Sequence, residues 1–441
     1  MQDARGNPVS TASATALAQH EHAAWQLVGF YGDPYAALDA AIAADPGWAL
    51  ARIAKADLLM TLTEPALLPQ ARALLDAAQP LLVHANARER AHHAAASLCA
   101  QGRWQAAGAA WDAILLDHPR DILALKTAHL FDFYRGDFRN LRGRVARVLP
   151  QWSAELPLHA YVLGMHAFGL EEANLHAQAE AAGRASLALD ARGPWAIHAV
   201  AHVLEMQGRH AEGRAWLEDR HDTWALDNGL STHQWWHLAL FQLETLDTGA
   251  ALALYDAQLG GTGLSINLQW LDAAALLWRL DLLGVDVGAR WQALAAAWAD
   301  PVAQAGHYAF NDVHAALALI GSGDCTRANA LLERAVPAEG DNRAMALDVG
   351  VPLLRSLLDH AQGRHDAAAH KLYALRGHAH RFGGSHAQRD LIDQTLLAAC
   401  AAGNRRDIGR AVLDERRLAK PATPLTEHWA RRLGLPTHAA R

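Results

Sequence analysis

Two pairs of histidines with the same spacing recur in this chain, and their side chains are the ones best suited to chemistry. His198 and His202 form the first pair, and His233 and His237 form the second pair 35 positions further along. Both pairs lie in segments whose composition predicts helix, and residues four apart share one face of a helix. Imidazoles on such a face can act as general bases, hydrogen-bond partners or metal ligands. The recurrence predicts one site built from equivalent helices of neighbouring repeats.

Other polar residues have a helical spacing that would place them in the same site. Glu205 follows His202 by three positions, and Asn311 lies three positions before His314. A further polar run begins a predicted helix directly after a pair of glycines. The candidate catalytic residues are His198, His202, Glu205, His237 and Arg389. The candidate ligand-binding residues are Trp195, His233, Trp235, Trp236, Asn311, Asp312, His314, Ser385, His386, Gln388 and Asp390.

The composition limits the classes of protein to which the chain can belong. Of its 441 residues 51% are hydrophobic and 19% are charged, and the formal net charge is -7. Interspersed charges of both signs argue against a nucleic-acid-binding surface. The opening residues lack the apolar run of a signal peptide, and no run of about 18 apolar residues is present. We expect a cytoplasmic protein with no nucleic-acid or membrane partner, and Cys99, Cys325 and Cys400 are scattered in a way that predicts buried thiols.

Turn signals separate amphipathic segments at intervals close to the tetratricopeptide period. A Gly-Arg or Gly-Asp pair begins a new segment at positions 32, 102, 136, 208 and 363, and the second and third of these lie 34 residues apart. Alternation of apolar and polar residues is rare. We predict an all-α, tetratricopeptide-like superhelix (an α-solenoid of helix pairs, right-handed) of roughly 16 to 20 helices.

The expected domain organisation is simple. Residues 1–14 are predicted to be irregular, and residues 15–441 are predicted to form a single superhelix. The runs 259–264 and 336–341 contain the best candidates for breaks, and both are more typical of loops between repeats.

Five segments carry a more specific pattern. They are Met165-His-Ala-Phe168-Gly-Leu-Glu171-Glu172, the run from Trp195 to Arg209, His233-Gln-Trp235-Trp236-His237, Leu271-Asp272-Ala-Ala-Ala-Leu-Leu-Trp278-Arg279, and Gly383-Gly384-Ser385-His386-Ala-Gln388-Arg389-Asp390. Together with the opening Gly6-Asn-Pro-Val-Ser10-Thr11, they resemble the tetratricopeptide repeat protein 38 family over essentially the whole chain. Gln234 stands where we expect Asn in that family, which alters the hydrogen bonding there.

The resemblance implies a fold and no particular reaction. It implies a superhelix in which the helix before each Gly-Arg or Gly-Asp turn lines a concave groove. His198, His202 and Glu205 precede such a turn at Gly208-Arg209, so the resemblance places them inside the groove.

Three functions compete for that groove. The favoured one is a closed pocket that binds a small molecule or a peptide, narrowed by large side chains, namely Trp195, Trp235, Trp236 and Phe310. The second is a cofactor-free enzyme in which a histidine is the general base, Glu205 or Asp312 orients it, and Arg389 stabilises an anion. The third is a metal centre, since a His-x3-His pair on one helix can hold a divalent ion.

The sequence argues for a site without metal or cofactor. The zincin spacing, with Glu directly after the first His, is absent. Trp235 and Trp236 would also crowd the second histidine pair. We therefore expect tag-free protein to contain well under one equivalent of zinc, iron, manganese or nickel. The oligomeric state is left open.

Some residues fit a structural role instead. Trp111 and Trp278 have the spacing of helix-packing residues and are predicted to lie in the core. His92 and His93 lie near a predicted turn and are predicted to be solvated. The adjacent pair of Arg389 and Asp390 fits an internal salt bridge as well as it fits a site.

Overall fold

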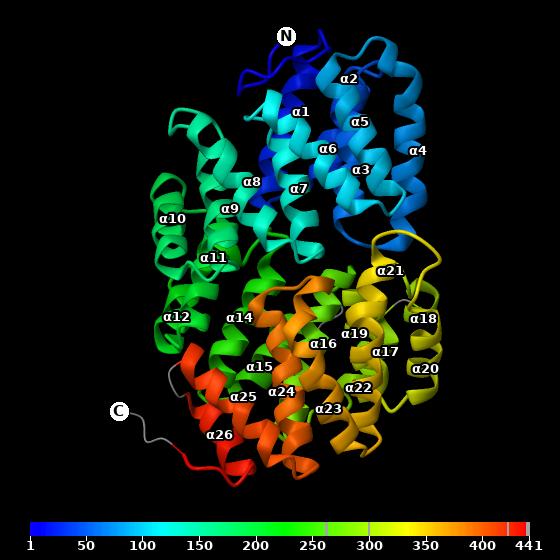
Figure 1. Cartoon of the computed structure of the whole chain (residues 1–441). Coiled ribbons are helices and arrows are strands. Elements are labelled where there is room, and N and C mark those ends of the chain that lie inside the picture. The colour runs from blue at the N-terminus through cyan, green and yellow to red at the C-terminus, as the bar shows by residue number, and fades with distance from the viewer. Residues whose placement is uncertain (261–262, 299, 421–422, 438–441) are drawn as a thin grey trace. The chain divides into compact units, whose positions relative to one another are not determined.

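The chain folds almost entirely into helices. The computed structural model describes residues 1–260, 263–298, 300–420 and 423–437. Helices joined by turns account for most of these residues (Figure 1), and their only extended pairings are two isolated bridges, Gln2 with Pro8 and Tyr31 with Asn228. The prediction of an all-α protein is confirmed. The predicted loop 259–264 includes residues 261–262, which lie outside the described ranges.

The helices group into two compact units. Unit 1 comprises residues 1–200, 222–230 and 339–341, and unit 2 comprises residues 201–221, 231–338 and 342–441. Two helices, α11 (Pro194–Met206) and α13 (His221–Trp224), continue from one unit into the other. His198 therefore belongs to unit 1 and His202 to unit 2, although one turn of the continuous helix α11 joins them.

Unit 1 is built from consecutive helices that pack on their neighbours in sequence. Its helices are α1 (Ala14–Gly29), α2 (Pro34–Ala44), α3 (Ala49–Thr61), α4 (Leu68–Ala78), α5 (Ala87–Ala100), α6 (Trp104–Asp117), α7 (Ile122–Tyr134), α8 (Phe138–Val148), α9 (His159–Glu171) and α10 (His176–Leu189). The pairs α1 with α2, α3 with α4, α5 with α6 and α9 with α10 share the most extensive contacts.

Unit 2 follows the same plan with more one-turn helices. Its helices are α12 (His210–Glu218), α14 (Ser231–Glu244), α15 (Thr248–Leu254), α16 (Asn267–Leu282), α17 (Arg290–Ala297), α18 (Pro301–Gln304), α19 (Ala309–Gly321), α20 (Cys325–Arg334), α21 (Asn342–Met345), α22 (Val351–Ala361), α23 (His365–Leu375), α24 (His386–Ala402), α25 (Arg406–Ala419) and α26 (Pro424–Arg432). The described residues form more helices than the roughly 16 to 20 predicted from the repeat period. Four-residue helices such as α13, α18 and α21 lie in connections, which the repeat period does not count.

Glycines with positive φ produce the predicted turns. Gly102 has a φ of 75° between α5 and α6, and Gly136 has a φ of 63° between α7 and α8. A residue with a Cβ rarely adopts that backbone conformation. The next residue then begins a helix, and at Asp137 its carboxylate accepts the backbone N–H of Asn140. The five predicted Gly-Arg and Gly-Asp turns all lie between two helices and are confirmed.

Large aromatic side chains fill the interior of both units. Trp111 is fully buried in unit 1, and its ring stacks on that of Phe131 at a centroid distance of 5.6 Å. Trp278 is buried in unit 2, where its Nε1 donates a hydrogen bond of 2.9 Å to Oγ1 of Thr395. The prediction that both tryptophans pack in the core is confirmed.

The prediction that His92 and His93 are solvated is wrong, because both are buried on α5. Nε2 of His92 lies 2.8 Å from Oδ2 of Asp121, and Nη1 of Arg88 donates to the same oxygen at 2.6 Å. Although burial opposes it, the charges of His92 and Arg88 hold the pKa of Asp121 well below its usual value. Asp121 lies 29 positions after His92, so the local sequence gave no sign of this partner.

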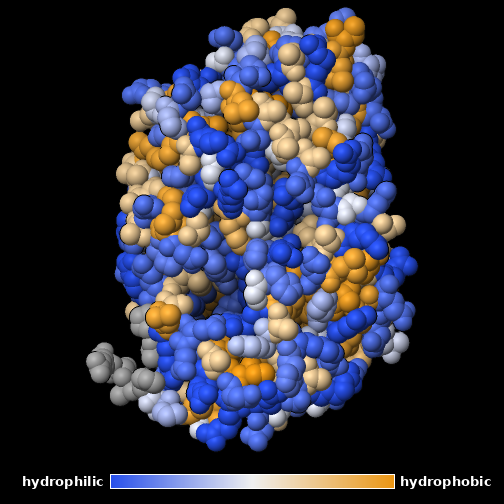
Figure 2. Space-filling view, viewed as in Figure 1, coloured by the Kyte–Doolittle hydropathy of each residue, from blue (hydrophilic) through white to orange (hydrophobic). Residues whose placement is uncertain are grey.

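The surface and the helices of the described residues were compared with what a membrane-spanning protein requires. On the face drawn in Figure 2, hydrophilic residues alternate with small apolar patches. None of the described helices combines the length and the apolar character needed to cross a bilayer.

Replacing Trp111 with Ala should lower the free energy of unfolding by about 3 to 5 kcal/mol, because the lost indole leaves a cavity in the core of unit 1. Urea unfolding measures the change. The matched control is Leu116→Ala on the same helix, since Leu116 is 74% exposed, and it should change the stability by no more than about 0.5 kcal/mol. Similar losses in the two variants would contradict the assignment of Trp111 to the core.

Candidate functional site

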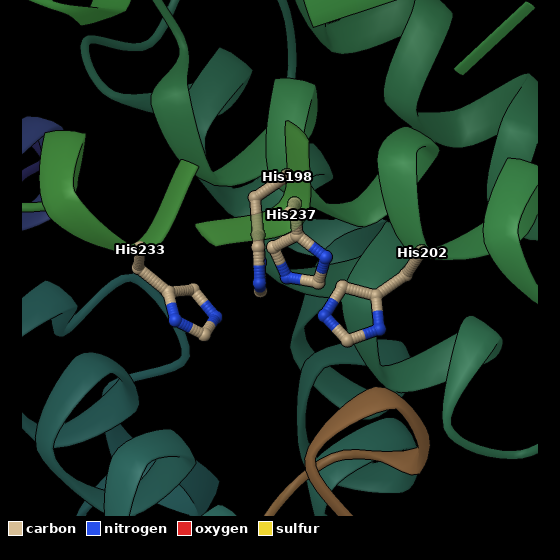
Figure 3. A group of neighbouring side chains, drawn as sticks. All are labelled: His198, His202, His233 and His237. Atoms are coloured by element: carbon tan, nitrogen blue, oxygen red, sulfur yellow. The ribbon is translucent and has the colours of Figure 1, made fainter. Parts of the chain in front are cut away.

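Helices α11 and α14 bring the two predicted histidine pairs together. His198 and His202 project from α11, and His233 and His237 project from α14. One ring nitrogen from each of these residues, hereafter the histidine group, lies within 4.8 Å of the others. Figure 3 shows the four imidazoles facing one another across a small space. The recurrence in the sequence therefore corresponds to one group in space.

The histidine group is closely packed and mostly buried. The ring of His237 lies 4.4 Å from that of His202 and 4.8 Å from that of His233, measured between centroids. His198, His202 and His237 are at most 2% exposed, whereas 17% of the His233 side chain is exposed. His233 is thus the member of the group nearest to solvent.

A carboxylate from α16 fixes the orientation of His233. Nδ1 of His233 lies 2.8 Å from Oδ2 of Asp272, which is 1% exposed. An ionised carboxylate only accepts hydrogen bonds, so Nδ1 carries the proton and Nε2 keeps its lone pair. Trp236 stacks on the same imidazole, with the planes 15° apart. Asp272 and Trp236 together hold the ring in one orientation and one tautomer.

Burial keeps two members of the group uncharged. It lowers the pKa of His237 well below its usual value, and the neighbouring His233 acts in the same direction. Burial also lowers the pKa of His202 well below its usual value, and the neighbouring His237 acts in the same direction. Neutral imidazole is the form that accepts a proton or binds a metal. Both residues are therefore in the competent state at neutral pH.

Glu205 is close to the group on the side of His237. Its Oε2 lies 3.4 Å from Nδ1 of His237, and its Oε1 lies 3.7 Å from Nζ of Lys420. Burial raises the pKa of Glu205 to about 7, although Lys420 acts in the opposite direction. Beside Glu205, a cavity of about 20 Å³ has room for roughly one water molecule.

In unit 1, aromatic residues pack around the beginning of α11. Trp195 is 6% exposed, stacks on Phe30 at 5.4 Å, and donates from Nε1 to Nε2 of His129 at 3.3 Å. The ring of His198 lies 5.2 Å from that of Phe168. The indole of Trp195 is thus engaged by its neighbours within unit 1.

The adjacent tryptophans of α14 lie on different faces of the helix, as helical geometry requires. Trp236 is fully buried and contacts both His233 and His237. Trp235 is partly exposed and packs on the ring of His221 at 5.6 Å. Only Trp236 therefore shares a face with the histidines of α14.

Buried charges surround Glu244 at the C-terminal end of α14. Its Oε1 accepts hydrogen bonds of 3.0 Å from Nη2 of Arg416 and 3.2 Å from Nζ of Lys420, and its Oε2 accepts one of 2.6 Å from Oγ1 of Thr423. Although burial opposes it, the charges of Lys420 and Arg416 lower the pKa of Glu244. Arg416 also pairs with Asp390. The salt bridge of Asp390 is therefore made with Arg416 on α25.

The polar run before α24 is a helix cap. Oγ of Ser385 accepts the backbone N–H of Gln388 at 3.2 Å, and Oε1 of Gln388 accepts the backbone N–H of Ser385 at 3.0 Å. This reciprocal capping box accounts for the spacing of the two residues. Arg389 donates to the carbonyl of Gly384, and its Nη2 lies 3.2 Å from Nδ1 of His386.

The three candidates on α19 are buried, and two of them bond to backbone atoms of their own segment. Asn311 is 7% exposed. Oδ2 of Asp312 accepts the N–H of Gly306 at 3.1 Å, and burial raises the pKa of Asp312 to about 8. Nδ1 of His314 donates to the carbonyl of Phe310 at 2.8 Å, and burial lowers the pKa of His314 to about 4.

Sequence reasoning did not select the charged residues that support the histidine group. These are Asp272, Glu244, Arg416 and Lys420. The available signal for Asp272 was a single acidic residue in the apolar run from Leu271 to Trp278. The other three lie near residues of ordinary helix composition, and only the fold brings them together.

Comparison of the chain with models of known protein families finds no model that matches it. The function is therefore argued from the geometry and chemistry of the site itself.

Asp312→Asn should remove a pH dependence of stability. The carboxyl has a pKa of about 8 when folded, against 3.8 as its ordinary value. Between these values the folded state holds a proton that the unfolded state has released, so the free energy of unfolding of the wild type falls as the pH rises. The stability of the variant relative to the wild type should therefore rise across this window.

Urea unfolding at about pH 5 and about pH 8 measures this difference. Asp76→Asn is the control, because Asp76 is exposed, and its stability relative to the wild type should be the same at both pH values. A flat difference for Asp312→Asn as well would show that Asp312 is ionised in the folded protein.

Proposed function

We propose that the histidine group binds one divalent transition-metal ion in a structural site that joins α11 and α14. The observation that carries the proposal is the convergence of four imidazole nitrogens within 4.8 Å of one another. A zinc–nitrogen bond of about 2.0–2.1 Å places two ligands of a tetrahedral site about 3.4 Å apart. Small rotations of the rings toward their common centre would reach that spacing.

The carboxylate of Asp272 favours a bound cation beside the group, whereas the positive charges of Arg279 and Arg389 oppose one. Asp272 is 1% exposed, and its Oδ1 has no hydrogen-bond partner among the described residues. A buried carboxylate is costly unless a positive charge compensates it. Arg279 supplies part of that charge, and an ion bound to Nε2 of His233 would add to it through the imidazole, in the carboxylate–histidine–metal arrangement common to zinc sites.

The donor set favours zinc. Imidazole nitrogens suit zinc, copper, nickel and iron, whereas calcium and magnesium prefer oxygen ligands. Four protein ligands close a tetrahedral coordination sphere, as in structural zinc sites. We therefore propose that the ion fastens α14 to α11.

This proposal departs from the metal-free site expected from the sequence. That expectation rested on the absent zincin spacing and on crowding of the second histidine pair by Trp235 and Trp236. Trp235 contacts His221 instead, and Trp236 stacks on the face of His233, whereas the nitrogens lie at the ring edge. The sequence-based expectation is a protein without bound metal, whereas the present proposal is a protein with one bound ion. Elemental analysis distinguishes the two.

We further propose that the helices follow a tetratricopeptide-like superhelix of the protein 38 kind, with a groove for a small molecule or a peptide. Turns 34 residues apart and the pairing of consecutive helices support this proposal. Native mass spectrometry of protein purified without additives would test the groove, since a retained organic ligand adds a mass distinct from that of a metal ion.

Tag-free protein purified without added metal should contain about one equivalent of zinc per chain, because a closed site of four neutral imidazoles binds zinc tightly. The double variant His202→Ala, His237→Ala should lose it, leaving less than about a tenth of an equivalent. Elemental analysis by plasma mass spectrometry measures both contents.

The matched control for this measurement is His314→Ala, because His314 is also a buried histidine of unit 2 and lies outside the group. It should retain the full equivalent. A wild-type content well under one equivalent for zinc, iron, manganese and nickel would overturn the metal proposal and restore the metal-free pocket.

Asp272→Asn should weaken zinc binding by about 10-fold to 100-fold, because an amide no longer fixes the proton on Nδ1 of His233 as a carboxylate does. Competition with a chromophoric chelator measures the affinity. Asp281→Asn on the same helix α16 is the control and should leave the affinity unchanged. Equal affinities in the two variants would show that Asp272 does not orient a metal ligand.

A further inference from the structure

A cleft of about 440 Å³ lies in unit 2 among helices α16, α19, α22, α24 and α26 and the first residue of α23. Its volume falls in the range of about 300 to 1,000 Å³ that is usual for small-molecule sites. None of its lining residues belongs to the histidine group. It is therefore a separate feature of the molecule.

One side of the cleft is apolar. Trp278 and Leu282 come from α16, Ile320 from α19 and Ala398 from α24. The indole of Trp278 is held by the hydrogen bond from its Nε1 to Oγ1 of Thr395. These side chains form a fixed surface on which an apolar group of a ligand could pack.

The other side offers two imidazoles in contact. Nδ1 of His360 lies 3.2 Å from Nδ1 of His365, so one ring donates a hydrogen bond to the other. The accepting ring, when neutral, must carry its proton on Nε2. The pair, which lines the cleft, thus keeps at least one N–H donor outside the hydrogen bond between the two rings.

A cationic side chain stands at the rim. Nη1 of Arg432 donates to the carbonyl of Leu282 at 2.8 Å, and the guanidinium lies 5.2 Å from the ring of Trp429. Arg432 forms no ion pair with a carboxylate of the described chain. Burial lowers the pKa of His360 to about 4, and the charges of His365 and Arg432 act in the same direction.

Among the described residues that line the cleft, Asp281 is the one acidic side chain, and it is already hydrogen-bonded. Oδ2 of Asp281 accepts a hydrogen bond of 2.6 Å from Nε1 of Trp291. Trp291 packs over Gly321, where a Cβ would lie 2.3 Å from the indole, so the absence of a side chain at Gly321 keeps this side of the cleft in shape.

We propose that this cleft binds a small organic carboxylate with an apolar body. The carboxylate accepts hydrogen bonds from the guanidinium of Arg432 and from the histidine pair. The apolar body packs on Trp278, Leu282 and Ile320. The site needs both parts, because an exposed guanidinium alone attracts anions only weakly.

Isothermal titration calorimetry of the full chain tests the proposal with sodium 3-phenylpropanoate as the probe. Its neutral amide and inorganic phosphate serve as comparisons that lack the charge and the apolar body, respectively. We expect the carboxylate to bind with a Kd of about 1 mM or lower and each comparison to bind at least about 10-fold more weakly. Phosphate binding as tight as that of the carboxylate, or no binding of the carboxylate at about 10 mM, would overturn the proposal.

Variants of cleft residues test whether the carboxylate probe binds in the cleft. Arg432→Gln should weaken carboxylate binding by at least about 10-fold, and Arg431→Gln, its exposed neighbour outside the cleft, should leave it unchanged. Ala402→Trp at the exposed mouth should block the cleft and abolish binding. Circular dichroism confirms that each variant is folded. Equal affinities for the two arginine variants, or full binding by Ala402→Trp, would place the probe elsewhere and contradict the assignment.

Discussion

Polar groups that a helix carries into an apolar interior must find partners there, and the histidine group depends on one partner above all, the carboxylate of Asp272. Its hydrogen bond to Nδ1 of His233 directs the lone pair of Nε2 away from α16. Burial then keeps His202 and His237 neutral by lowering the pKa of each imidazole. A fixed tautomer and uncharged rings are what a metal ligand requires. Both conditions are set by packing rather than by the histidines themselves.

Helix α14, which carries His233 and His237, is also held in place by a buried polar residue and its partners. Helix α14 ends at Glu244, whose carboxylate binds Arg416, Lys420 and Thr423. Replacing one partner of such a buried ion pair leaves an uncompensated charge and costs about 3 to 5 kcal/mol. Arg416, Lys420 and Thr423 therefore help to hold α14 in place. The position of His237 is in this way tied to residues nearly two hundred positions further along the chain.

How much of the fold and of the histidine group could be predicted depended on how far apart in the sequence the interacting residues lie. Local rules were sufficient for the all-α class and for the turns at Gly102 and Gly136, since helical periodicity and the conformational freedom of glycine determine them. Partners distant in sequence were not predictable, and for that reason Asp272 was missed and the burial of His92 against Asp121 was predicted wrongly. Ser385 and Gln388 illustrate a further limit, because the spacing of a capping box is also the spacing of a polar site on a helix.

The central claim is that four imidazole nitrogens can bind one ion. X-ray absorption spectroscopy at the zinc edge, on tag-free protein loaded with one equivalent of zinc, addresses it most directly. We expect a first shell of four nitrogen atoms at about 2.0–2.1 Å with the outer-shell scattering of imidazole rings. Sulfur neighbours at about 2.3 Å, or a first shell of oxygen atoms without imidazole scattering, would contradict it.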